Sequence, residues 1–298
     1  MRVGIVAPQG WTGEFEGVGA IDAWDRMLRA AREADRLGFD SIWLYDHFHT
    51  TPDPKPTITF ESFMSLAAIA SATSRARIGH LVSCAGYRNP ALAAKMISTL
   101  DVRSGGRAEF GVGAGWKEEE WRAYGYPFPS LRERQQRLRD SLEIARRMLR
   151  AAGRESYQGP TAEIAGAFNV PASAGRGPIP VMVGGNGRET TWRIAAAQAD
   201  ELNLDAMPPD ELPGALADLA NRCEEAGRDP AGLRVSVHIW WEHLRAGDPV
   251  ELLAAYQEAG VSRVMTLARD AASDDEAVER LRDQAVRAGA EFDPIAAA

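Results

Sequence analysis

The chain has 298 residues, of which 45% are hydrophobic and 26% are charged, and its formal net charge is −8 at pH 7. This negative balance disfavours nucleic acid and other polyanionic partners, because such partners bind basic surfaces. No apolar run reaches the length of about 18 residues that a membrane-spanning helix needs, so we expect no membrane segment.

The cysteines and the first residues indicate a reducing compartment. Cys84 and Cys223 lie far apart and form no CxxC motif, which argues against a disulfide framework. The opening residues, MRVGIVAP, lead directly into a strand-like run and lack a signal-peptide core with a cleavage site. We therefore predict a cytoplasmic protein.

Hydrophobic periodicity predicts strands that alternate with helices along the chain. The first helix ends at Gly38, and another begins at Pro90, whose ring suits the first helical position. Tyr126-Pro-Phe-Pro129 interrupts a long helical region that restarts at about residue 131 and runs through Leu149. The predicted strands cover residues 3–7, 40–45, 77–85, 108–113, 179–183, 201–204, 235–241 and 261–267, and further helices cover 20–37, 60–72, 187–197, 210–226, 250–259 and 274–288.

Eight strand–helix pairs with short links predict a (β/α)8 TIM barrel. A doubly wound sheet usually has about five to seven strands and a glycine-rich phosphate turn after its first strand. Here the first turn, Pro8-Gln9-Gly10-Trp11, lacks the GxGxxG pattern. Residues 153–178 are rich in Gly, Pro and Ala and have a weak period, which predicts a loop. We therefore predict one domain, residues 1–298, with a loop insertion at about 153–178.

In a TIM barrel the active site lies at the carboxyl ends of the strands, so these positions identify the candidate site. Glycines there allow a flat or anionic ligand to approach the backbone, because glycine carries no Cβ. The helix that begins after Gly187 offers free N–H groups, and Arg188 adds positive charge. These features favour a large planar cofactor that carries a phosphate. The strand ends hold Pro8-Gln9, Asp46-His47, Val82-Ser83-Cys84, Gly113 to Trp116, Gly184 to Gly187, Asn203, Trp240-Trp241 and Thr266.

Several of these residues also have a structural interpretation. Asp46 could cap the loop that follows the second strand, and His47 could be a satisfied, partly buried histidine. We interpret Cys84 as a pocket-wall residue and Lys117–Glu120 as a solvated helix start, where glutamate is favoured. His238 has no partner that the sequence identifies.

A metal site is a further alternative. His47-x-His49 resembles the HxH pair of barrel zinc hydrolases, since imidazole is a favoured zinc ligand. That motif normally lies on the first strand and needs a carboxylated lysine and more histidines on strands four to six. Those predicted strands contain neither Lys nor His. We therefore predict no metal site.

Longer motifs resemble the luciferase-like monooxygenase superfamily, and within it most closely the branch that uses coenzyme F420. The matches span roughly residues 1–230 in the family's order, and several motifs together are more specific than one glycine pattern. The resemblance implies a (β/α)8 barrel with a deazaflavin or flavin across the strand ends, and often a homodimer. The motifs are YDHF at 45–48, YRNPALAAKM at 87–96, LDVRSGGRAEFGVGAGW at 100–116, KEEEWRAYGYPFPSLRERQQRL at 117–138 and VMVGGNGRETTWRIAAAQADELN at 181–203.

The resemblance also implies roles for individual residues. Asp46 would lie near the cofactor ring and His47 on the substrate side, which makes these two the candidate catalytic residues. A bulge behind the ring, often with a non-prolyl cis bond, would fall at Leu81-Val82. The bacterial luciferases place an arginine for the FMN phosphate at the position of Ala114, so its absence favours F420 over FMN. The complete set of cofactor-binding candidates is Asp46, Leu81, Val82, Ser83, Gly113, Ala114, Gly115, Trp116, Arg132, Gly184, Gly185, Asn186, Gly187 and Arg188.

These observations predict an oxidoreductase in which F420 exchanges a hydride with a small organic substrate. His47 would give or take a proton, because imidazole titrates near pH ~6.5. The alternatives are an FMNH2-dependent monooxygenase that uses O2, a non-catalytic flavin-binding barrel and the zinc hydrolase. The bound cofactor distinguishes the first alternative, because deazaflavins do not support the addition of oxygen.

Overall fold

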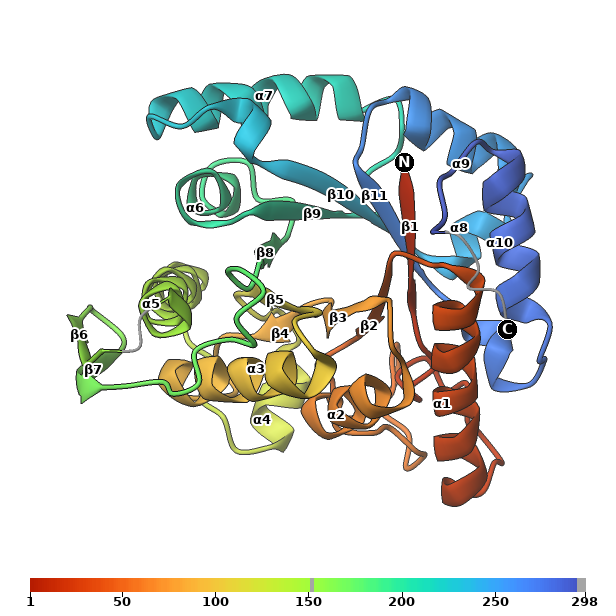
Figure 1. Ribbon diagram of the computed structural model, residues 1–298, viewed down its shortest axis with the longest axis horizontal. Coiled ribbons are helices and arrows are strands. Elements are labelled where there is room, and N and C mark those ends of the chain that lie inside the picture. The colour runs from red at the N-terminus through yellow and green to blue at the C-terminus, as the bar shows by residue number, and fades with distance from the viewer. Residues whose placement is uncertain (151–152, 294–298) are drawn as a thin grey trace.

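Parallel strands form a closed ring at the centre of the computed structural model, which describes residues 1–150 and 153–293 (Figure 1). The order around the ring is β3-β2-β1-β11-β10-β9-β8-β5, and the pairing of β3 with β5 closes it. The third position holds two segments, β3 and β4, and both pair with β5. The predicted TIM barrel is therefore confirmed. Its strands are β1 (Arg2–Val6), β2 (Ser41–Leu44), β3 (Arg77–His80), β4 (Ser83–Cys84), β5 (Ala108–Gly113), β8 (Val181–Gly184), β9 (Glu201–Asp205), β10 (Arg234–Ile239) and β11 (Arg263–Leu267).

Helices cover the outside of the ring (Figure 1). The first ends at Gly38, whose φ of 86° lies in the left-handed region that glycine adopts readily. The third begins with Pro90, and the side chain of Asn89 caps its first N–H groups. No helix within residues 1–150 and 153–293 has the length and hydrophobicity that crossing a membrane requires. The helices are α1 (Ala20–Leu37), α2 (Ser62–Ala72), α3 (Pro90–Ser104), α4 (Glu118–Ala123), α5 (Leu131–Arg150), α6 (Thr191–Gln198), α7 (Leu212–Glu225), α8 (Trp241–Arg245), α9 (Pro249–Glu258) and α10 (Ala277–Arg287).

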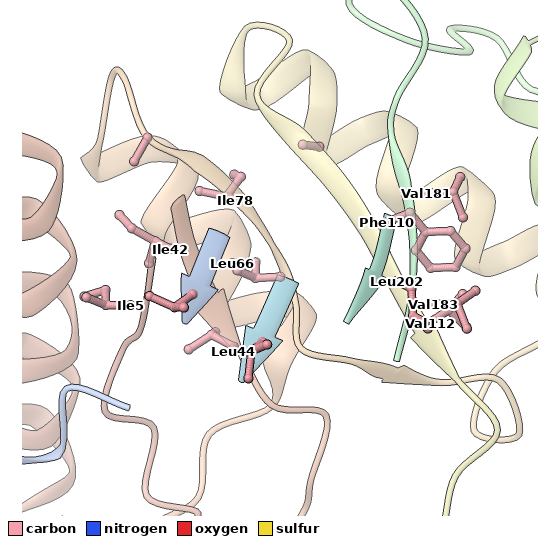
Figure 2. Close-up of a cluster of buried hydrophobic side chains, with 14 of the residues drawn as sticks. Ile5, Ile42, Leu44, Leu66, Ile78, Phe110, Val112, Val181, Val183 and Leu202 are labelled. Atoms are coloured by element: carbon pink, nitrogen blue, oxygen red, sulfur yellow. The ribbon is translucent and has the colours of Figure 1, made fainter. Parts of the chain in front are cut away.

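Strand residues alternate between two hydrophobic clusters, because successive side chains point to opposite faces of a sheet. Ile5 and Ile42 belong to the large cluster between the strands and the helices, part of which is drawn in Figure 2. Val6 and Trp43 belong to a separate cluster inside the barrel. A Cβ at Gly79 would lie 2.7 Å from the Trp43 ring, so glycine makes room for this indole. The barrel interior is therefore a packed core.

Buried charges fill the barrel at the amino-terminal ends of the strands. Arg263 binds Glu109 at 2.8 Å, Glu201 at 2.7 Å and Asp40 at 2.9 Å. Arg77 pairs with the same Glu109 carboxylate. Burial alone would raise the pKa of Glu109, but Arg263 and Arg77 lower it to about 2. These ion pairs keep the Glu109 carboxylate charged inside the fold.

The segment 153–178 differs in part from the loop that the sequence predicts. It contains an antiparallel hairpin of β6 (Glu155–Gln158) and β7 (Glu163–Ala167). Asp140 of α5 anchors this hairpin, because its carboxylate accepts hydrogen bonds from Tyr157 Oη at 2.8 Å and from Thr161 N at 2.8 Å. The hairpin buries little apolar surface, and this explains its weak hydrophobic period.

One predicted strand end differs from the structure, and the predicted domain end lies outside the described residues. Trp241 begins α8, whereas the sequence places it at the end of the seventh strand. The predicted domain range of 1–298 ends in residues 294–298, which lie outside the described residues.

Replacing Arg263 by Leu should lower the free energy of unfolding by about 3–5 kcal/mol, because Glu109 and Glu201 would stay buried without their shared cation. Urea unfolding at pH 7, followed by circular dichroism, measures this loss. The matched control is Arg29→Leu, which removes an exposed ion pair with Asp275 and should cost less than about 1 kcal/mol. Equal losses in the two variants would contradict the assigned role of Arg263.

Candidate functional site

A cavity of about 210 Å³ opens at the carboxyl-terminal ends of the strands. Residues from β4, β5, β8, β9 and β10, and from the loops after β1 and β2, meet around it. Ten of them were predicted as catalytic or cofactor-binding residues: Asp46, His47, Leu81, Val82, Ser83, Gly113, Gly115, Trp116, Gly184 and Gly185. Cys84, Asn203 and Trp240, which the sequence places at strand ends, also line it. The remaining lining residues are Trp11, Tyr45, Tyr87, Lys117, Asp205 and His238.

Glycines leave one wall of this cavity without side chains. A Cβ at Gly113 would lie 2.8 Å from Val82 Cγ2, and one at Gly115 would lie 2.6 Å from Cys84 Sγ. Gly115 and Gly185 also have φ values of 80° and 135°, which side chains rarely tolerate. The Leu81–Val82 peptide beside this wall is cis, as the resemblance implied. The wall can therefore accept a flat ring close to the backbone.

The buried carboxylate of Asp46 is held by Arg88. Its Oδ2 accepts hydrogen bonds from Arg88 Nη1 at 2.6 Å and from Cys84 N at 2.9 Å. Its Oδ1 accepts from Ser62 Oγ at 2.9 Å and from Arg88 Nη2 at 3.0 Å. Burial would raise the pKa of Asp46, but Arg88 holds it below its ordinary value. Asp46 is therefore an ionised anchor that connects the end of β2 to α2 and β4.

His47 lies between aromatic rings and a carboxylate. Its ring stacks on Trp11 with centroids 4.3 Å apart, and it meets Trp116 edge to face at 5.8 Å. Its Nδ1 lies 2.7 Å from Oε2 of Glu120, a side chain that is fully buried. Burial would raise the pKa of Glu120, but His47 and nearby donors lower it. The ionised carboxylate therefore accepts a hydrogen bond from Nδ1–H. The other ring nitrogen, Nε2, then stays available to accept or donate a proton.

A second imidazole–carboxylate pair lines the same cavity. His238 Nδ1 lies 2.9 Å from Asp205 Oδ1, and His238 Nε2 lies 2.9 Å from Tyr45 Oη. Burial raises the pKa of Tyr45 well above its ordinary value, so the phenol stays protonated and donates to Nε2. Both nitrogens of His238 are engaged, in contrast to those of His47. Sequence reasoning found no partner for His238 because Tyr45 follows β2 and Asp205 lies on β9, both far from His238 in the sequence.

Some predicted cofactor residues are not among those that line the cavity. Arg132 is exposed at the start of α5, whereas Arg134 donates to the backbone oxygen of Gly115 at 3.1 Å. Arg188 pairs with Asp218. Their predicted roles in cofactor binding stay predictions. The residues outside the lining are Ala114, Arg132, Asn186, Gly187 and Arg188.

The interpretation of residues 117–120 as a solvated helix start was wrong for Lys117 and Glu120. Lys117 is buried and donates to the backbone oxygen of Thr50 at 3.0 Å. Glu120 accepts hydrogen bonds from Tyr87 Oη at 2.9 Å and from Phe48 N at 2.6 Å, besides its contact with His47. The signal in the sequence was Trp121, a large apolar residue next to Glu120. The structure buries Trp121 fully, so this side of α4 packs inward.

Both histidines of the HxH pair have partners other than a metal. His49 Nδ1 lies 3.2 Å from the backbone oxygen of Thr50, while His47 binds Glu120. Across residues 1–150 and 153–293, no group of three or more His, Cys, Asp and Glu side chains could hold a metal ion.

The chain is similar to several known proteins. Residues 1–297 match the family described as Luciferase-like monooxygenase. An uncharacterized protein of Mycobacterium tuberculosis is 30% identical over 275 residues, which cover 85% of this chain and 91% of that protein. The F420-dependent glucose-6-phosphate dehydrogenase of Intrasporangium calvum is 33% identical over 142 residues, or 47% of this chain and 41% of that enzyme. A solved structure of an F420-dependent secondary alcohol dehydrogenase in complex with an F420–acetone adduct has a TM-score of 0.79 at 19% identity, and covers 96% of this chain and 98% of that one.

Replacing Glu120 by Gln should make the free energy of unfolding depend less on pH under acidic conditions. The folded-state pKa of Glu120 lies below its ordinary value. The ionised carboxylate therefore contributes stability above the unfolded pKa of about 4.3, and this contribution is lost as the pH falls below it. We expect the free energy of unfolding of Glu120→Gln to decline less steeply between about pH 6 and pH 3 than that of wild type. The neighbouring exposed Glu119→Gln should keep the wild-type slope, and a wild-type slope in Glu120→Gln would contradict this account.

Proposed function

The chain belongs to the luciferase-like monooxygenase family, and on that basis we propose that it is an oxidoreductase that exchanges a hydride between coenzyme F420 and a small organic substrate. The observation that carries this proposal is the pairing of His47 with the buried Glu120 beside a wall of glycines. Such an arrangement combines a surface for a planar ring with a group that can move a proton. The similarity to an F420-dependent dehydrogenase supports the choice of cofactor.

The cavity residues suit a flat ring that carries carbonyl acceptors. Gly113 and Gly184 keep side chains away from the ring plane, and Leu81 and Val82 offer apolar contact. Trp11 Nε1 is buried and has no hydrogen-bond partner among the described residues, so this donor can meet a ring carbonyl. When bound, F420 supplies the ring carbon that gives or takes the hydride.

We assign proton transfer to His47 and positioning to Asp46. Glu120 fixes the imidazole by accepting Nδ1–H, and the stacked Trp11 holds the ring plane. The Nε2 atom of His47 can then exchange a proton with the oxygen or nitrogen bonded to the substrate carbon that gives or takes the hydride. Asp46 is occupied by Arg88, Ser62 and the Cys84 backbone, so it holds the strand end beside the cofactor.

The quaternary state and the location complete the proposal. Met64 on α2 and Leu92 and Val102 on the neighbouring α3 are exposed apolar residues on the outside of the barrel. Exposed apolar surface of this kind often marks a protein interface, and a second copy of the chain is the partner that we propose.

Cys84 and Cys223 are buried and form no disulfide, which suits a cytoplasmic location.

The cofactor proposal predicts that F420 binds the apoprotein more tightly than FMN does. Fluorescence titration with each cofactor measures this difference. Gly113→Ala should weaken F420 binding by about tenfold. The added Cβ would collide with Val82 and displace it toward the space that the ring occupies. Gly214→Ala is the matched control, since a Cβ there meets no atom within 4 Å. Tight binding of FMN alone would instead identify the FMN-dependent monooxygenase.

Replacing His47 by Gln should lower kcat with an accepted substrate by about 10²–10⁴-fold, the usual contribution of a positioned acid or base. The dissociation constant of F420 should change little, because His47 is assigned to the substrate side. His49→Gln provides the control, since this nearby histidine does not line the cavity. Unchanged turnover in His47→Gln would rule out the assigned proton transfer and favour a non-catalytic barrel.

The dimer proposal predicts twice the monomer mass in light scattering. Combining Met64→Lys with Leu92→Lys should convert the protein to a monomer, because the charges would have to be buried in the interface. Ile21→Lys, at an exposed apolar position on α1, should leave the mass unchanged. A monomeric wild-type protein would contradict the dimer.

A further inference from the structure

A second cavity, of about 250 Å³, lies between β11 and the helices α8, α9 and α10, in the blue part of Figure 1. Trp240 lines the first cavity and Trp241 lines the second, so consecutive residues separate the two. Thr266 faces the second cavity, whereas its neighbour Met265 belongs to the cluster inside the barrel. The proposed hydride transfer makes no use of this second space.

Buried polar atoms without partners belong to three residues that line this cavity. Trp241 Nε1, Thr266 Oγ1 and Arg269 Nε have no hydrogen-bond partner among the described residues. The Thr266 residue is only 3% exposed. The indole and guanidinium nitrogens can only donate, and a hydroxyl can donate as well. Because unsatisfied buried donors are unfavourable, these groups call for a ligand with several acceptor oxygens.

The charges around the cavity favour an anion. Arg245, Arg269 and Arg280 line it, and Asp270 is the one carboxylate among the lining residues. Asp270 forms an ion pair with Arg245 at 3.3 Å, and Arg280 forms ion pairs with Asp274 and Glu276. These arginines disfavour a cation as the occupant.

Arg269 is the cation that remains for a ligand. It has no ion pair among the described residues. Its Nη2 donates to the backbone oxygen of Thr12 at 3.4 Å, and its guanidinium lies over the Trp241 ring at 4.8 Å. This cation–π contact restricts the position of the guanidinium beside the cavity.

The size and the remaining lining indicate an organic molecule. The cavity of about 250 Å³ has room for much more than one water molecule, so a small organic molecule fits. Leu244, Pro249 and Leu281 provide apolar walls beside the polar end. We propose that this cavity binds a small organic anion, whose carboxylate or phosphate group contacts Arg269, Trp241 and Thr266 and whose apolar body packs on Leu244 and Leu281. The proposal does not depend on the proposed oxidoreductase function.

Indole ¹⁵N–¹H spectra of the whole protein test this site, because they report each tryptophan separately. Inorganic phosphate, phenyl phosphate and benzoate are the probes, and Trp241→Phe assigns the Trp241 signal. We expect a saturable shift of that signal and tighter binding of phenyl phosphate than of inorganic phosphate, because the phenyl ring adds apolar contact. A response to the phosphates alone, or to benzoate alone, would identify the anionic group. Shifts of Trp11 or Trp240 without Trp241, or shifts that do not saturate, would overturn the proposal.

Two variants distinguish a loss of ligand binding from a loss of folding stability. Arg269→Gln should weaken binding of the phosphate probes by about tenfold or more, as expected for a lost hydrogen bond to a charged group. Thr266→Val should also weaken binding, yet it should leave the melting temperature unchanged or raised, because it removes an unpartnered buried hydroxyl. Arg122→Gln, at an exposed arginine paired with Glu118, should bind as wild type does. Wild-type affinity in Thr266→Val and Arg269→Gln, or an equal loss in Arg122→Gln, would refute the site.

Discussion

The carboxylate of Glu120 holds three segments of the chain at one point. It accepts hydrogen bonds from His47 and Phe48 in the loop after β2 and from Tyr87 before α3, although Glu120 itself lies on α4. Because the carboxylate is fully buried, losing these donors would leave a charge without partners. The orientation of His47, and with it the shape of the cavity, therefore depends on this one side chain. The contrast with His238, whose two nitrogens both have hydrogen-bond partners, supports the proposal that His47 is the imidazole that acts on a ligand.

The two ends of the barrel have different tasks. At the amino-terminal ends of the strands, Arg263 and the carboxylates around it fill the interior with paired charge. At the carboxyl-terminal ends, glycines such as Gly113 and Gly184 leave the interior open. This division is typical of TIM barrels, in which one end supports stability and the other carries the active site. The stable end allows the open end to vary without loss of the fold.

The sequence predicted the features that depend on local chemistry. Alternating hydrophobic runs identified the strands and helices of the barrel, and glycines at strand ends such as Gly113 and Gly184 marked a wall of the cavity. It missed features that depend on distant partners. The role of Glu120 requires knowing that α4 packs on the loop after β2. The partners of His238 lie in that same loop and on β9. The β6–β7 hairpin escaped notice because it is half exposed and has little hydrophobic period.

The central claim is that a flat redox ring lies against the glycine wall, with His47 on the substrate side. A crystal structure of the protein with F420 tests this claim most directly. We expect the ring beside Val82 and Gly113, with Trp11 Nε1 donating to a ring carbonyl and with His47 still paired to Glu120. A ring bound away from the Gly113 wall, or His47 turned away from the space beside the ring, would contradict the account.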